Sequence, residues 1–209
     1  MSVQIRILGR DARNIGETPA VALVNPKYPH NVGAAVRAAS CFGARQVWFS
    51  GDRVTLDPLA RATRLPREER MKGYRDVSVV QCDMFFDAFP KWVTPVAVEF
   101  RGEAEMLPTF EHPEHALYVF GPEDGGLMPV QLRLCHRFVM IPSTHCLNLS
   151  AAVNLVLYDR MVKRMAQGLV PLMAPADYVA QDRAMRPAAP DVDMTVWSQD
   201  GRSNQEEQR

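Results

Sequence analysis

Three short segments carry the polar side chains of this 209-residue chain that are best placed to do chemistry. They span residues 25–37 (NPKYPHNVGAAVR), 120–127 (FGPEDGGL) and 141–150 (IPSTHCLNLS). Each lies at the end of an apolar run that predicts a buried strand, and each combines Gly, Pro or Asn with a polar group at a predicted helix start. Ligands of open parallel sheets bind outside the carboxyl ends of the strands. The co-occurrence of three such segments therefore favours a functional site.

The first segment places Asn31 where a helix N-cap belongs and Arg37 about two turns further along. Gly33 and four nearby alanines make this a thin helix, which other backbone can approach closely. A guanidinium there can hold a phosphate through two hydrogen bonds. The alternative is that Asn31 only caps the helix and Arg37 only solvates its surface.

The second segment is a tight Gly-rich loop. It lacks the Lys and Ser/Thr of a Walker loop, and its glycines are not spaced as in the dinucleotide fingerprint. Gly121, Gly125 and Gly126 can expose backbone groups to a flat ligand, while Glu123 can accept hydrogen bonds or orient a neighbour. A plain surface turn with two solvated acids is the alternative.

The third segment leads from a strand that ends at Pro142 into a long apolar helix that opens at Asn148. Asn148 can present its amide to a substrate hydroxyl, and Ser150 follows two residues later. Helix capping alone also accounts for an Asn at this position.

The elements around these segments predict an α/β fold, a parallel sheet with helices on both faces. We expect strands at 20–24, 46–50, 77–80, 95–100, 117–120 and 138–141. We expect helices at 31–42, 57–71, 83–89, 129–135 and 147–167. One domain then covers residues 1–168, and 169–209 form a Pro-punctuated extension with at most a short helix near 176–184 and a disordered end.

Composition narrows the class of protein. Hydrophobic residues make up 47% and charged residues 23%, as in soluble globular domains. The 24 basic and 24 acidic residues cancel, which argues against a basic arm that coats nucleic acid non-specifically. The sequence has neither a signal peptide nor an apolar run near the roughly 20 residues needed to cross a membrane. We therefore expect a reduced, cytoplasmic protein with no membrane partner.

The cysteines are Cys41, Cys82, Cys135 and Cys146, and they form no CxxC pair. The neighbours Cys135-His136 and His145-Cys146 suggest zinc ligands. However, adjacent residues on a strand point to opposite faces, so each pair offers one ligand easily and the second only with strain. We expect no metal.

In this order and at this spacing, the three segments resemble the motifs of the SpoU/TrmH-type RNA 2'-O-ribose methyltransferases of the SPOUT superfamily. The first motif is an Asn, a Gly two residues on and an Arg four further, here Asn31, Gly33 and Arg37. The second resembles FGxExxGL, here 120–127, and the third is Ile-Pro followed by Leu-Asn-Leu-Ser, here 141–142 and 147–150. The resemblance covers residues 19–168.

The resemblance implies a parallel α/β sheet with a deep C-terminal trefoil knot, which no local pattern predicts. It also implies S-adenosylmethionine bound within the knot, largely by backbone groups of the second and third motifs. Carried over by position, the cofactor-binding residues are Val98, Gly121, Ile141, Cys146 and Leu147. Many relatives have Ser where Cys146 stands, and a backbone contact survives that change.

The resemblance further implies a homodimer in which Arg37 of one subunit reaches toward the other's cofactor. The implied catalytic residues are Arg37, Asn31, Glu123 and Asn148, and the implied substrate contacts are Arg37 and Ser150. In the family this Arg is proposed to activate the ribose 2'-hydroxyl, but arginine stays protonated at neutral pH and is a poor general base. We expect it to bind the phosphate and position the hydroxyl.

The implied partner is RNA, and the chain's compactness favours tRNA over rRNA. A basic cluster can supply the positive surface, or can be an ordinary solvated helix; it comprises Arg53, Arg61, Arg64, Arg67, Arg70, Lys72 and Arg75. Three alternatives stay open: a SPOUT base methyltransferase, a non-catalytic RNA-binding SPOUT dimer, and a flavodoxin-like nucleotide-binding protein. The Arg of the first motif favours ribose as the acceptor.

Overall fold

The computed structural model of the chain describes residues 6–8, 16–56 and 77–185. Its strands are β1 (Arg6–Leu8), β2 (Ala20–Leu23), β3 (Gln46–Phe49), β4 (Ser78–Gln81), β5 (Thr94–Val98), β6 (Glu105–Met106), β7 (Ala116–Phe120) and β8 (Arg137–Met140). Its helices are α1 (Pro29–Phe42), α3 (Pro129–Leu132), α4 (Leu149–Ala166) and α5 (Pro175–Met185), with 3-10 turns η2 (Phe85–Ala88) and η3 (Leu107–Thr109).

The chain divides into two compact units, residues 1–170 and residues 171–209. The second unit contains α5, at the place where the sequence predicts a short helix. The predicted helix at 57–71, most of the basic cluster and the predicted disordered end lie outside the described residues.

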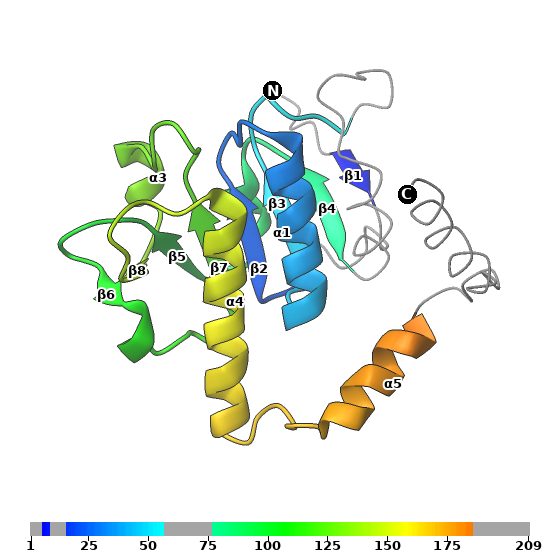
Figure 1. Cartoon of the computed structure of the whole chain (residues 1–209). Helices are drawn as coiled ribbons and strands as arrows, with labels where there is room; N and C mark the ends of the chain where they lie inside the picture. The colour runs from blue at the N-terminus through cyan, green and yellow to red at the C-terminus, as the bar shows by residue number, and fades with distance from the viewer. Residues whose placement is uncertain (1–5, 9–15, 57–76, 186–209) are drawn as a thin grey trace, which may run out of the picture. The chain divides into compact units, whose positions relative to one another are not determined.

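The described strands form one sheet in the order β1-β4-β3-β2-β7-β5-β8-β6 (Figure 1). All neighbouring pairs are parallel except β1 and β4, which are antiparallel. The six predicted strands are confirmed to within two residues at each end. The sequence analysis missed β1 and β6, which are short strands at the two edges and lack an apolar run of their own.

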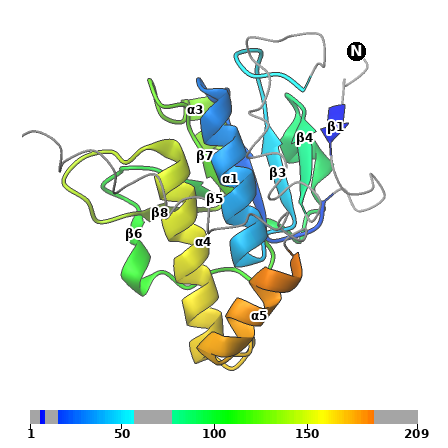
Figure 2. The same ribbon diagram turned by 45° about the vertical axis from the view of Figure 1, so that its right-hand side comes forward.

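Alternate side chains of the central strands enter two different apolar cores. Along β2, Val21 and Leu23 join one core, while Ala20 and Ala22 join the other. Helices α1 and α4 pack side by side over the first core (Figure 2). The second core receives Phe85 of η2 and Leu132 of α3. The prediction of helical cover on both faces is confirmed, with only short helical segments on the second face.

The strand order brings the three polar segments together at the carboxyl ends of the central strands. Leu23 at the end of β2 pairs with Phe120 at the end of β7, and Phe120 also pairs with Val98 at the end of β5. Val98 in turn pairs with Val139 near the end of β8. The carboxyl ends of these four strands therefore lie together, where ligands of such sheets bind.

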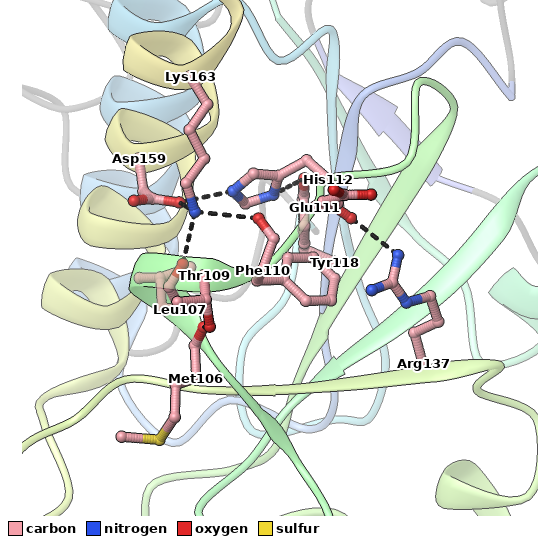
Figure 3. Close-up of polar contacts among 10 residues, drawn as sticks. All are labelled: Met106, Leu107, Thr109, Phe110, Glu111, His112, Tyr118, Arg137, Asp159 and Lys163. Atoms are coloured by element: carbon pink, nitrogen blue, oxygen red, sulfur yellow. Dashed lines mark hydrogen bonds and ion pairs between the residues drawn. The ribbon is translucent and has the colours of Figure 1, made fainter.

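A partly buried hydrogen-bond network ties α4 to the segment between β6 and β7 (Figure 3). His112 Nδ1 lies 2.6 Å from Tyr118 Oη, and His112 Nε2 lies 2.7 Å from Asp159 Oδ2. Lys163 Nζ reaches the same carboxylate at 2.7 Å and donates to two backbone carbonyls around η3. A neutral imidazole satisfies this geometry, because Nδ1 accepts a hydrogen bond from the Tyr118 hydroxyl and Nε2–H donates one to Asp159.

We expect this histidine to make the fold sensitive to acid. Burial lowers the pKa of His112 and outweighs the hydrogen bond to Asp159, which raises it; the charges of Lys163 and Arg160 lower it further. The unfolded chain therefore binds a proton at His112 more readily than the folded chain. Neutral His112 therefore stabilises the fold fully when the pH is above the ordinary histidine pKa of about 6.5. This contribution to the free energy of unfolding is lost as the pH falls from that value toward the lower pKa of His112 in the folded chain.

Urea denaturation at about pH 7.5 and pH 5.5 measures this effect. The free energy of unfolding should fall more steeply with acid in the wild type than in His112→Gln, whereas the exposed His115→Gln variant should follow the wild type. Equal pH dependence in wild type and His112→Gln would contradict the assignment.

Candidate functional site

A chain of hydrogen bonds joins the three polar segments. Asn31 Nδ2 donates to Glu123 Oε1 at 2.5 Å, and Asn148 Nδ2 donates to Asn31 Oδ1 at 3.2 Å. These partners are 92 and 117 residues apart in the sequence. The fold therefore brings together Asn31, Glu123 and Asn148, three of the four predicted catalytic residues.

Glu123 holds the loop after β2 at two points. Its Oε2 accepts the backbone N–H of Lys27 at 2.8 Å, while Oε1 accepts the Asn31 amide. Asn31 is only 1% exposed, so its amide depends on these protein partners rather than on water. A single carboxylate thus fixes the path of the chain into α1.

The prediction that Asn31 is the N-cap of this helix is wrong. Helix α1 begins at Pro29, and Tyr28 occupies the N-cap without a side-chain hydrogen bond. Proline suits the first helical position, because its ring fixes φ and its missing N–H has no acceptor there. Asn31 therefore lies inside the first turn, where its side chain is available to bridge Glu123 and Asn148.

Asn148 both caps a helix and joins the network. Its Oδ1 accepts the backbone N–H of Ser150 at 2.9 Å and of Ala151 at 3.4 Å at the start of α4. The Ser150 hydroxyl donates to the same oxygen at 2.7 Å. Because Nδ2 is left for Asn31, the capping role and the site role of this residue coexist.

A pocket of about 410 Å³ opens beside this network at the carboxyl edge of the sheet. Its walls include Val98, Gly121, Ile141, Cys146 and Leu147, which are the residues predicted to bind a cofactor. The volume is typical of small-molecule sites. Glu123 also lines this pocket, so the network and the pocket share a side chain.

The Gly-rich loop forms one wall of the pocket by folding back on itself. A Cβ added to Gly121 would lie 2.4 Å from the backbone carbon of Gly126 and 2.6 Å from the nitrogen of Leu127. Gly126 has a φ of +68°, which favours glycine. A Cβ at Gly125 would meet no atom within 4 Å. The close approach therefore requires glycine at 121 and leaves 125 tolerant.

The sequence analysis missed Glu99, a second carboxylate in the pocket wall. Its Oε2 accepts the backbone N–H of Leu127 at 2.8 Å, and its Oε1 accepts that of Phe100 at 3.2 Å. The available signal was its position directly after Val98, a predicted cofactor-binding residue, within the predicted strand 95–100. Glu99 and Glu123 together favour a ligand that carries positive charge.

Arg37 stands apart from the pocket of its own chain. Its side chain is exposed on α1 and is not part of the pocket wall. Among the residues that the structure describes, none forms a hydrogen bond or ion pair with it. Within one chain, all predicted site residues except Arg37 therefore lie in the hydrogen-bond network or in the pocket wall.

The described residues contain no group of three His, Cys, Asp or Glu side chains arranged to hold a metal ion. All four cysteines are free thiols. None of the helices in the described part is both long and apolar enough to span a membrane.

Curated relatives match most of the chain. The 23S rRNA (guanosine-2'-O-)-methyltransferase RlmB of Coxiella burnetii is 29% identical over 156 residues, which cover 72% of this chain and 61% of the relative. The tRNA (cytidine-2'-O-)-methyltransferase TrmJ of Methanocaldococcus jannaschii is 26% identical, with 70% of this chain and 68% of the relative covered. This chain thus spans about three fifths of the RlmB relative's length.

Solved structures share the fold. The SpoU methyltransferase AviRb from Streptomyces viridochromogenes, in complex with AdoMet, superposes with a TM-score of 0.61 at 20% identity, covering 76% of this chain and 66% of AviRb. The A. aeolicus TrmH/SpoU tRNA modifying enzyme gives 0.60 at 17% identity, covering 81% and 89%. The SpoU rRNA Methylase family model matches residues 19–158, a range that includes all three polar segments. This chain therefore belongs to the SpoU rRNA methylase family.

Proposed function

We propose that this chain transfers a methyl group from S-adenosylmethionine to a ribose 2'-hydroxyl of RNA. The main support is geometric: the pocket that contains Val98, Gly121, Ile141, Cys146 and Leu147 is joined through Glu123 to the helix that bears Arg37. Family membership and relatives named as RNA 2'-O-methyltransferases support the same activity.

The pocket suits S-adenosylmethionine, which supplies an electrophilic methyl group when bound. Glu99 and Glu123 offer carboxylates to a ligand with cationic sulfonium and ammonium groups. The folded-back loop at Gly121 exposes backbone groups to a flat ring. Cys146 keeps its backbone groups available whatever its side chain, and the AviRb structure in complex with AdoMet supports this choice of cofactor.

We propose that Arg37 acts on the pocket of a partner subunit in a homodimer. Leu155, Tyr158 and Val162 lie three and four residues apart on α4, beside α1, and all three are exposed. Such an apolar stripe supports an interface at this face. Arg37 would bind the RNA phosphate next to the target ribose and orient the hydroxyl, while Ser150 contacts the substrate beside Asn148.

Two finer points belong to this proposal. We propose that the chain forms the deep trefoil knot implied by its motifs, and the fold shared with AviRb supports it. The class of RNA is a separate matter, because RlmB is named for 23S rRNA and TrmJ for tRNA. These relatives give no support to our preference for tRNA, so tests should offer both RNA classes.

Replacing Arg37 by Ala should lower methyl transfer by about 100-fold or more, because a misplaced hydroxyl no longer meets the methyl group in line. Cofactor affinity should stay within about twofold, since the role proposed for Arg37 is to bind the RNA phosphate and not the cofactor. Incorporation of labelled methyl groups into separate tRNA and rRNA pools measures the first quantity, and calorimetry measures the second. The exposed Arg45→Ala variant is the control. Activity of Arg37→Ala near that of the wild type would rule out the role given to Arg37.

Replacing Gly121 by Ala should weaken S-adenosylmethionine binding by at least about tenfold, because the new Cβ overlaps backbone and must displace the pocket wall. Gly125→Ala is the matched control in the same loop, where the added methyl meets open space. Isothermal titration calorimetry compares the two variants, and thermal melts check that both fold. Wild-type affinity in a folded Gly121→Ala variant would exclude this pocket as the cofactor site.

A further inference from the structure

An exposed aromatic pair lies beside the pocket and is not used by the proposed methyl-transfer chemistry. The rings of Tyr28 and His30 stack with centroids 5.3 Å apart and an interplanar angle of 18°. Both side chains are exposed, Tyr28 by 42%. Tyr28 is the N-cap of α1 and His30 lies in its first turn, after the carboxyl end of β2. Two rings in an exposed parallel stack can accept a further flat ring.

Glu123 fixes this pair in place. Its two carboxylate oxygens bind Lys27 N–H and the Asn31 amide, one on each side of the three-residue segment that carries the rings. Pro29 stands between the two aromatic residues and restricts the backbone further. The rings are therefore held in position relative to a side chain of the pocket, which lowers the entropic cost of binding a ligand on them.

Positive charge lies next to the rings. Lys27 Nζ is 5.4 Å from the centroid of the Tyr28 ring. Lys27 and Arg53 approach the same carboxylate, that of Asp124, at 3.8 Å and 2.8 Å. Glu123 and Asp52 also lie near these cations, so the group as a whole carries no net positive charge. Lys27 is nevertheless the cation closest to the Tyr28 ring, and its exposed ammonium can approach a phosphate that flanks a stacked base.

We propose that Tyr28 and His30 form a stacking platform for an unpaired base of the RNA substrate, with Lys27 beside a flanking phosphate. The inference rests on the proposed function and adds a substrate-binding element to it. Unstacked RNA bases are recognised by stacking on aromatic side chains, and flat rings next to cations match that chemistry. The two rings bordered by charged side chains form too small an apolar patch for an apolar protein partner.

The test compares Tyr28→Ala, Tyr28→Phe and Trp92→Ala. Trp92 is a matched control, because it is 57% exposed and also pairs with a histidine, its ring centroid 4.5 Å from that of His115. It precedes β5, at the amino ends of the strands, whereas the pocket lies at their carboxyl ends. Tyr28→Ala should raise the KM for RNA by about 5-fold to 100-fold, with the effect on KM rather than on kcat. Tyr28→Phe retains the ring and should restore most of the affinity, while Trp92→Ala should match the wild type.

The outcomes separate this platform from the proposed function. If the wild type methylates RNA and Tyr28→Ala leaves the RNA KM unchanged, the platform is overturned and ribose methylation stands. A loss of cofactor affinity or kcat without a change in RNA KM would assign Tyr28 a purely structural role and would also overturn it. If the wild type transfers no methyl group, direct RNA binding by the same variants decides: weaker binding by Tyr28→Ala alone supports the platform, and equal binding overturns it.

Discussion

The carboxylate of Glu123 and the amides of Asn31 and Asn148 form the interaction on which the site depends. They join loops that leave different strands, and each loop alone would be an ordinary surface turn. Asn31 is almost completely buried, so loss of its charged partner would leave an unsatisfied amide at a cost of about 1–3 kcal/mol. Because Asn31 lies in the first turn of α1, this interaction also anchors the start of the helix that carries Arg37.

The network can form only because of the strand order. Pairing of β2 with β7, and of β7 with β5, places the ends of three strands side by side. The loop after β7 then folds tightly enough at Gly121 for Glu123 to reach back to Lys27 and Asn31. The same fold of the loop forms the pocket wall. The pocket wall and the position of the Glu123 carboxylate beside the start of α1 thus both follow from the strand order and the tight loop after β7.

Much of this could be predicted from the sequence. Apolar runs mark the central strands, and Gly43 and Gly168, both with positive φ, mark the ends of α1 and α4. The edge strands escaped prediction because two or three residues carry no periodic pattern. The start of α1 was misplaced because Pro29 can open a helix without a side-chain cap. Contacts between distant residues, such as those of Glu99, arise only from folding, and the fold of one chain leaves Arg37 exposed and away from the pocket.

The chemical identity of the methylated product tests most directly the claim that this chain methylates a ribose 2'-hydroxyl of RNA. RNA labelled by the wild-type protein with methyl-labelled S-adenosylmethionine would be hydrolysed in alkali, and the fragments separated. A 2'-O-methyl group removes the nucleophile that cleaves the adjacent phosphodiester bond, so we expect the label in alkali-resistant dinucleotides. Label found in mononucleotides would show methylation of a base and contradict the account. An absence of label in both tRNA and rRNA, from a protein that binds the cofactor, would also contradict it.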